Sequence, residues 1–145
     1  MSGDKVFVDT NILIYAYDIS AGIRHETAKK LLARLWNSGQ GVISTQVLQE
    51  FYVTATRKLP KVMDPLVAKE IVTDLLEWEL ATIEGPMILE AMELSQKHSF
   101  SFWDSLIIVA AQKADCTLLL SEDLSSGRTI GKLKIKNPFE TADKR

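Results

Sequence analysis

Residues 5–13, KVFVDTNIL, run from a short apolar stretch rich in β-branched side chains through the polar triplet Asp9-Thr10-Asn11 into a second apolar series. This pattern predicts a strand, a turn and the start of a helix. Four further short apolar runs alternate with helical patterns. The five strands are predicted at residues 5–8, 41–44, 81–83, 117–120 and 133–135. The alternation predicts an α/β fold of three layers, in which helices cover both faces of a central parallel sheet of about five strands.

Apolar spacing, caps and helix breakers define the predicted helices. The first helix follows Asn11, the second covers 24–37, and the third follows Ser44 and stops at Pro60. The fourth begins at Asp64-Pro65, the fifth begins at Gly85-Pro86, and the sixth covers 102–114. The helix at 102–114 is apolar almost all round, so we expect it to be buried on more than one side.

The chain has 145 residues, a formal net charge of −2 and 46% hydrophobic residues, which is typical of an ordinary globular domain. We expect one domain over residues 1–145 with a flexible tail at about 140–145. The single cysteine, Cys116, excludes an internal disulfide and fits a reducing cytoplasm. No apolar stretch suits a membrane span or an export signal, so we expect a cytoplasmic protein that does not bind membranes. The charge balance argues against holding nucleic acid by bulk charge.

Four acidic residues are predicted to lie at one edge of the sheet. Asp9 and Asp123 follow the first and fourth strands, and Glu50 lies about one turn into the helix after the second strand. Asp104 begins a helix that must end where the fourth strand starts, so its own beginning lies at the opposite edge. Because the carboxyl ends of parallel strands share one edge, the four carboxylates should converge there.

Each acid also has a plain structural interpretation. Asp9 can cap the helix that follows it, and Asp104 stands three residues after Ser101, at the spacing of a capping box. Asp123 can be a turn residue. Glu50 can be a solvated helix residue, although no cation lies three or four residues away to pair with it. The occurrence of all four acids at one predicted edge weakens these interpretations.

Carboxylates that share a cleft repel one another and raise one another's pKa, so a positive ion is expected among them. Oxygen ligands without cysteine or a suitably placed histidine favour Mg²⁺ or Mn²⁺ over zinc. Such ions promote phosphodiester hydrolysis, so phosphoryl chemistry is the expected use of this edge. His25 and His98 are isolated in the sequence and are interpreted as structural.

Aromatic and basic residues near this edge have two interpretations. Phe100, Phe102 and Trp103 can stack on bases, but their position at the start of a buried helix favours packing in the core. Eight cations can contact phosphates or lie on solvated faces. They are Arg24, Lys29, Lys30, Arg34, Arg128, Lys132, Lys134 and Lys136.

Over nearly its whole length the sequence resembles the PIN-domain family, in particular the VapC-type toxins of bacterial and archaeal toxin–antitoxin pairs. All four acids occur in order and at the spacing of the family. The resemblance rests on Val6-Phe7-Val8-Asp9-Thr10-Asn11, Gln49-Glu50-Phe51, Phe102-Trp103-Asp104-Ser105-Leu106-Ile107, Leu119-Leu120-Ser121-Glu122-Asp123-Leu124 and Asn137-Pro138-Phe139.

The resemblance implies a PIN-like α/β/α sandwich and a metal-dependent ribonuclease that leaves a 5′-phosphate on the cleaved RNA. Its catalytic and metal-binding residues would be Asp9, Glu50, Asp104 and Asp123, which would hold one or two Mg²⁺ or Mn²⁺ ions, with Asn11, Ser121 and Thr10 in support. The resemblance also implies a small VapB-type antitoxin that holds the toxin inactive. Toxins of this size commonly form homodimers, so a homodimer is expected.

Two other classes of function stay open. A catalytically idle PIN-fold scaffold would bind RNA or protein, although binding alone does not require four mutually repelling carboxylates. A phosphatase would need a second acid two residues after Asp9, where Asn11 stands instead. A phosphorelay receiver would need paired acids beside the first strand and a lysine after the last, and neither is convincing. The phosphate-binding glycine motifs of nucleotide hydrolases are absent.

Overall fold

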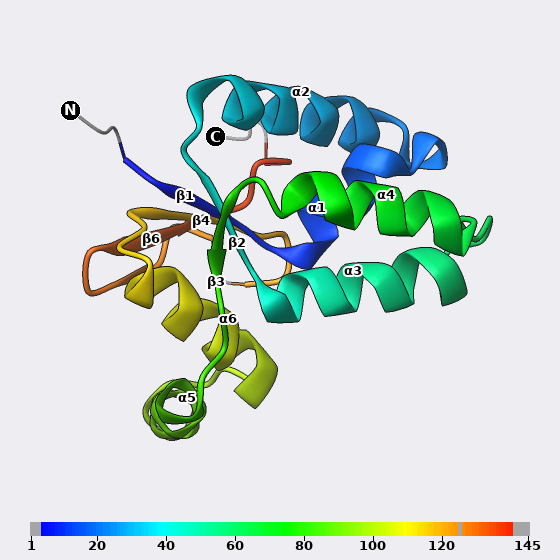
Figure 1. Cartoon of the computed structure of the whole chain (residues 1–145). Helices are drawn as coiled ribbons and strands as arrows, with labels where there is room; N and C mark the ends of the chain where they lie inside the picture. Colours follow the sequence, from blue (N-terminus) through cyan, green and yellow to red (C-terminus); the bar gives the residue numbers. More distant parts are fainter. Residues whose placement is uncertain (1–3, 125, 141–145) are drawn as a thin grey trace.

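The computed structural model describes residues 4–124 and 126–140, and it confirms the α/β architecture (Figure 1). The elements are β1 (Val6–Val8), α1 (Thr10–Tyr17), the 3-10 helix η1 (Ile19–Ala21), α2 (Ile23–Ser38), β2 (Gly41–Ser44), α3 (Thr45–Arg57), α4 (Pro65–Leu75), β3 (Glu79–Ala81), α5 (Gly85–Lys97), α6 (Phe102–Lys113), β4 (Leu118–Leu120), β5 (Thr129–Ile130) and β6 (Leu133–Lys136). Two α-helices lie between each pair of successive strands from β1 to β4. The expected flexible tail covers about 140–145, of which residues 141–145 lie outside the described part.

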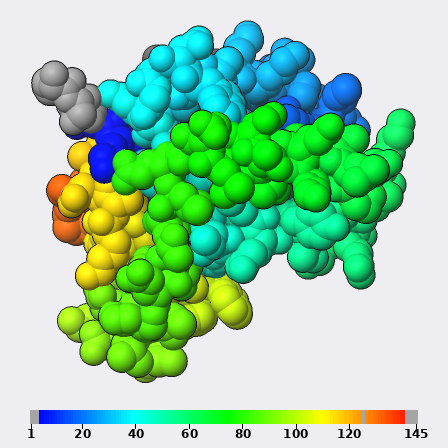
Figure 2. All heavy atoms as spheres, viewed as in Figure 1, coloured from blue at the N-terminus to red at the C-terminus, as the bar shows by residue number. Residues whose placement is uncertain are grey.

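The sheet has the strand order β3-β2-β1-β4-β6-β5, so β1 lies between two parallel neighbours, β2 and β4. Figure 1 shows α2 on one side of the sheet and α6 on the other, with α5 below α6. Figure 2 shows α3 and α4 forming a continuous surface, with α5 projecting at the bottom of the molecule. The three predicted layers are therefore present.

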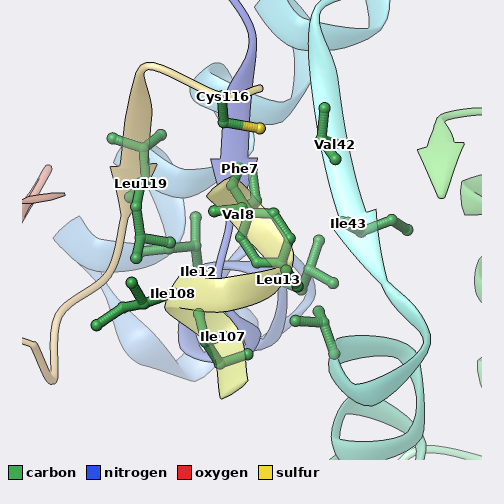
Figure 3. Packing of buried hydrophobic residues seen from close by; sticks show 14 of the residues in the cluster. Phe7, Val8, Ile12, Leu13, Val42, Ile43, Ile107, Ile108, Cys116 and Leu119 are labelled. Carbon is green, nitrogen blue, oxygen red and sulfur yellow. The ribbon is translucent and has the colours of Figure 1, made fainter. Parts of the chain in front are cut away.

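The hydrophobic core lies between the central strands and the helices that cover them (Figure 3). Phe7 of β1 and Leu119 of β4 are fully buried, and Ile108 of α6 packs in the same cluster. Residues 105–111 of α6 are all buried, as the apolar composition of this helix predicted. Cys116 is also buried. In the described part of the chain, no helix combines the length and the apolar character that crossing a membrane requires.

The sheet differs from the prediction at two strands. The sixth strand, β5, was not predicted, and it pairs antiparallel with β6 through Ile130 and Leu133. The connecting pair Gly131-Lys132 is a two-residue hairpin loop with glycine, at φ 61°, in the first position. β3 (Glu79–Ala81) both begins and ends two residues earlier than the predicted 81–83. It ends before Ile83, whose N–H donates to Thr45 Oγ1 at 3.2 Å.

Gly41 of β2 allows the indole of Trp78 to lie against the backbone of the strand, which a residue with a Cβ atom would prevent. A Cβ atom at this position would lie 2.5 Å from Cζ3 of Trp78, and Trp78 is itself buried against Trp36 with 5.6 Å between ring centroids. We therefore predict that Gly41→Ala lowers the free energy of unfolding by about 1–3 kcal/mol, measured by urea denaturation. The matched control is Gly85→Ala, where a Cβ meets no atom within 4 Å. Equal stability of the two variants would contradict the prediction.

Candidate functional site

Asp9 lies at the junction of β1 and α1, and both of its carboxylate oxygens are engaged. Oδ1 accepts the backbone N–H of Thr10 at 2.7 Å. Asp9 therefore caps α1, which confirms the structural interpretation of this residue. Oδ2 accepts the hydroxyl of Ser121 at 2.7 Å, a bond that crosses from the end of β1 to the end of β4. Only 6% of the Asp9 surface is exposed. A cap role alone does not account for a carboxylate buried at this depth.

Glu50 projects from the first turns of α3 toward the same edge. Its Oε1 accepts the hydroxyl of Thr10 at 2.7 Å, and its Oε2 accepts the amide of Gln46 at 3.1 Å. The side chain is half-buried, so the interpretation of Glu50 as a solvated residue is wrong. Thr10, the residue next to Asp9, therefore ties Glu50 to the end of β1 through a neutral hydroxyl.

Asp123 lies in the loop after β4 and is held by Asn11. The Asn11 amide donates to Asp123 Oδ2 at 3.0 Å, while Asn11 Oδ1 accepts the N–H of Glu122 at 3.3 Å. The N–H of Asp123 donates to the hydroxyl of Ser121 at 3.2 Å. One polar residue of α1 thus fixes both the backbone and the carboxylate of this loop.

Glu122 anchors the same loop to α1 and α2. Its carboxylate accepts the hydroxyl of Tyr15 at 2.7 Å and pairs with Arg24 at 2.5 Å. The Arg24 guanidinium also lies 5.5 Å from the ring centroid of Phe139. Arg24, expected as a phosphate contact or a solvated residue, is exposed, and it also forms an ion pair that holds the loop.

Asp104 lies in the first turn of α6, where its N–H donates to the hydroxyl of Ser101 at 3.1 Å. Burial raises the pKa of its carboxyl, and the Ser101 hydroxyl offsets part of this effect. The negative charges of Asp123 and Glu50 raise the pKa further. These two acids are therefore close enough to Asp104 for their charges to act on it.

Asp9 is the most perturbed of the four acids. Burial raises its pKa to about 6, while the hydroxyl of Ser121 and the N–H of Thr10 act in the opposite direction. The charges of Glu50 and Asp104 raise the pKa as well. Together with the effects on Asp104, these interactions link all four acids in one negatively charged region, built from β1, α3, α6 and the loop after β4.

The oxygen-only donor set of this region fits a hard divalent cation. Within residues 4–124 and 126–140, no three Asp, Glu, His or Cys side chains converge closely enough to hold one ion directly. Mg²⁺ retains several waters and needs only one or two protein carboxylates, so the separation of the acids is compatible with this ion. Among the described atoms, the buried Oε1 of Gln46, whose amide bonds Glu50, has no hydrogen-bond partner. Water held by a cation would satisfy such an acceptor.

Three polar residues of the site were not expected from the sequence. Gln46 supports Glu50, Tyr15 supports Glu122, and Lys58 lines a groove of about 440 Å³ together with Thr10 and Glu50. Gln46 stands four residues before Glu50, a spacing that brings side chains together on a helix, and this was the available signal. Lys58 lies two turns from Glu50, beyond that spacing.

The aromatic residues at the start of α6 divide between core and surface. Phe100 and Phe102 pack partly buried against the core, as expected. Trp103 does not, because 61% of its surface is exposed, and the expectation of core packing is wrong for this residue. The histidines make local contacts: Nδ1 of His25 lies 2.9 Å from the carbonyl of Tyr15, and Nδ1 of His98 lies 2.7 Å from Arg128.

Comparison with known proteins gives one family and several similar structures. Residues 6–129 match the PIN domain family. The fold is similar to that of a toxin–antitoxin complex from Klebsiella pneumoniae, at 22% identity and a TM-score of 0.68 over 94% of this chain and 100% of that chain. It is also similar to VapC20 from Mycobacterium tuberculosis, described as a sarcin–ricin loop cleaving toxin, at 20% identity and a TM-score of 0.61 over 79% and 87%. VapBC2 from Rickettsia felis, bound to a promoter DNA fragment, is similar at 20% identity and a TM-score of 0.65 over 91% and 97%. No curated protein matches the chain.

The raised pKa of Asp9 predicts a pH dependence of stability. The pKa is about 6 in the folded chain and about 3.9 in an unfolded one. Between about pH 3.9 and about 6 the folded state therefore keeps a proton on Asp9 that the unfolded state has released. The free energy of unfolding that this proton contributes is lost as the pH rises through about 6. Without metal at about pH 7.5, Asp9→Asn should be more stable than the parent by up to about 3 kcal/mol.

Urea denaturation in EDTA over a series of pH values measures this difference, which should shrink below about pH 6 and vanish near pH 4. The control is Asp74→Asn on the exposed surface of α4, which should show no such trend. A difference between Asp9→Asn and the parent that is constant over this range would show that the Asp9 carboxylate carries no burial penalty.

Proposed function

The chain belongs to the PIN-domain family, and on that premise we propose that it is a metal-dependent endoribonuclease and the toxin of a type II, VapBC-type toxin–antitoxin pair. The observation that carries the proposal is the burial of Asp9 beside two further acids, Glu50 and Asp104, whose charges raise its pKa. Such an arrangement lowers stability unless a cation joins it. The similar structures support the proposal because they include VapC20, described as a sarcin–ricin loop cleaving toxin, and toxin–antitoxin complexes.

In this proposal the metal ligands and catalytic acids are Asp9, Glu50, Asp104 and Asp123. The oxygen-only donor set suits one or two Mg²⁺ or Mn²⁺ ions. Such an ion supplies Lewis-acid stabilisation of the negative charge that develops on the phosphodiester oxygens during hydrolysis. The expected product carries a 5′-phosphate.

The supporting residues orient the acids through neutral hydrogen bonds. Ser121 holds Asp9, and Asn11 holds Asp123 at 3.0 Å. The hydroxyl of Thr10 holds Glu50 at 2.7 Å. Each donor leaves the carboxylate negatively charged and fixes its direction, which lowers the reorganisation needed when substrate and cation bind.

The proposed partners are an RNA substrate, a small VapB-type antitoxin and a second copy of the chain. An apolar groove of about 610 Å³ between α3 and α4 is lined by residues including Leu48, Tyr52 and Leu66, and it suits the apolar face of an antitoxin helix.

Leu89 and Met92 expose apolar surface on α5, which suits a homodimer contact. Action on cellular RNA places the proposed activity in the cytoplasm.

Activity is tested with purified protein and total or synthetic RNA in the presence of Mg²⁺ or Mn²⁺. We predict endonucleolytic cleavage that EDTA abolishes. Asp104→Asn should lower kcat at least about a hundredfold because it removes one of the proposed metal ligands. The surface variant Asp74→Asn is the matched control and should cleave at the parent rate.

The alternative function is a catalytically idle scaffold that binds RNA or protein. Failure of the parent protein to cleave any RNA with either metal, together with growth arrest that persists in Asp9→Ala cells, would favour this alternative. Sequencing of the 5′ ends that arise in cells after brief induction identifies the cleaved RNA when activity is present.

Metal binding is predicted to be measurable without any reaction. Mn²⁺ at a concentration one hundred times its Kd should stabilise the parent by about 2.7 kcal/mol, seen as a rise in Tm. Asp104→Asn should lose most of this rise, because its half-exposed carboxylate interacts with those of Glu50 and Asp123. Asp74→Asn should keep the full rise. A parent Tm that does not respond to Mn²⁺ or Mg²⁺ would contradict the proposed metal site.

A further inference from the structure

Trp103 is the most exposed tryptophan of the chain. Its exposed fraction is 61%, against 40% for Trp36 and 8% for Trp78. Indole is a large, mainly apolar group whose burial is favourable, and tryptophan is highly buried on average in folded proteins. An indole left this open at the start of an otherwise buried helix requires an explanation.

The position of Trp103 relates it directly to the acids. It precedes Asp104 in the first turn of α6. Nε2 of Gln46 donates both to the carbonyl oxygen of Trp103, at 3.3 Å, and to the carboxylate of Glu50, at 3.1 Å. A single side-chain nitrogen therefore ties the backbone of Trp103 to one of the proposed metal ligands.

The indole of Trp103 contacts the ring of Phe102 and is otherwise largely exposed to solvent. Phe102 packs against it in a T-shaped arrangement, with 5.1 Å between the ring centroids and an interplanar angle of 77°. Phe102 is itself partly buried against the core. A flat group that is already oriented loses little conformational entropy when a second flat group stacks on it.

A cation from the loop before β5 packs against the segment that precedes α6. Arg128 lies over the ring of Phe100, at 4.5 Å from the centroid, and its Nη2 is 2.7 Å from Nδ1 of His98. Guanidinium groups pair with phosphates, and exposed aromatic faces stack on unpaired bases. An exposed indole and a guanidinium beside a candidate phosphodiester-cleaving site fit a single-stranded polynucleotide better than the apolar face of a protein.

We infer that Trp103 stacks on an unpaired base of the RNA substrate beside the scissile phosphate, and that it thereby favours single-stranded over base-paired RNA. In a duplex each base already stacks on its neighbours and offers no free face to the indole. The inference rests on the proposed ribonuclease function and names a substrate-binding residue for it.

The test compares Trp103→Leu and Trp103→Tyr with the parent on a short unstructured RNA oligonucleotide in Mg²⁺. Leucine keeps an apolar side chain and removes the aromatic face, whereas tyrosine keeps a face. Trp103→Leu should raise KM roughly tenfold or more, with kcat changed by less than about twofold, and Trp103→Tyr should restore most of the loss. Trp36→Tyr is the matched control and should leave KM at the parent value.

A second readout needs no catalysis. In EDTA, the same oligonucleotide should quench the tryptophan fluorescence of the parent and of Trp36→Tyr, and this quenching should be lost in Trp103→Tyr. The parent should also bind the oligonucleotide more tightly than it binds a fully paired duplex of the same sequence.

The outcomes separate this inference from the proposed function. If the parent cleaves RNA and Trp103→Leu has the parent KM, the inference is wrong and the ribonuclease proposal stands. If the parent neither cleaves nor binds RNA, both are wrong. If the leucine and tyrosine variants are impaired equally, or if Trp103→Leu keeps its KM and instead loses a co-expressed antitoxin, stacking on a base is excluded in favour of a structural or protein-docking role.

Discussion

The pairing of β1 with β4 is the interaction on which the candidate site depends. Val8 is aligned with Leu120, and the N–H of Asp9 extends the ladder by donating to the carbonyl of Leu120 at 3.0 Å. This register places the Ser121 hydroxyl 2.7 Å from the Asp9 carboxylate, across 112 positions of sequence. Since side chains alternate between the faces of a strand, a slip of one residue would turn Asp9 away from Ser121. The central pairing of the sheet and the site are therefore specified together.

The cost of burying Asp9 is offset by the apolar groups on either side of it. Phe7 and Val8 precede it, Ile12 and Leu13 follow it, and all four are fully buried. Their burial provides about 1.5–3 kcal/mol of favourable free energy each, at about 25 cal/mol per Å² of apolar surface. The candidate site therefore sits where the core is strong enough to hold a carboxylate whose pKa is raised to about 6.

The backbone-level features could be predicted from the sequence, and the side-chain-level features could not. The rule that parallel strands end at one edge was enough to bring Asp9 and Asp104 into the same region, because it depends only on element order. The tie between Arg24 and Glu122 depends on the path of a loop and on side-chain rotamers, which periodicity does not encode. The exposure of Trp103 could not be predicted either, because an aromatic residue at a helix start has the same pattern whether it faces the core or solvent. β5 was missed because two residues give no periodicity, although Gly131 signalled its hairpin.

The acids of the candidate site have neutral hydrogen-bond partners, whereas other acids of the chain pair with lysine or arginine. This difference argues for a site that receives a cation from outside the chain. In the part of the chain that the structure describes, the ion pairs join Lys5 to Glu79, Arg24 to Glu122, Lys113 to Glu90 and Lys132 to Asp115. None of them includes Asp9, Glu50, Asp104 or Asp123. Glu122, adjacent to Asp123, is neutralised by Arg24, whereas the carboxylate of Asp123 accepts the neutral amide of Asn11. Acids with a purely structural role gain most from a fixed cation, so neutral donors at all the candidate positions preserve a negative charge that an incoming metal ion can use.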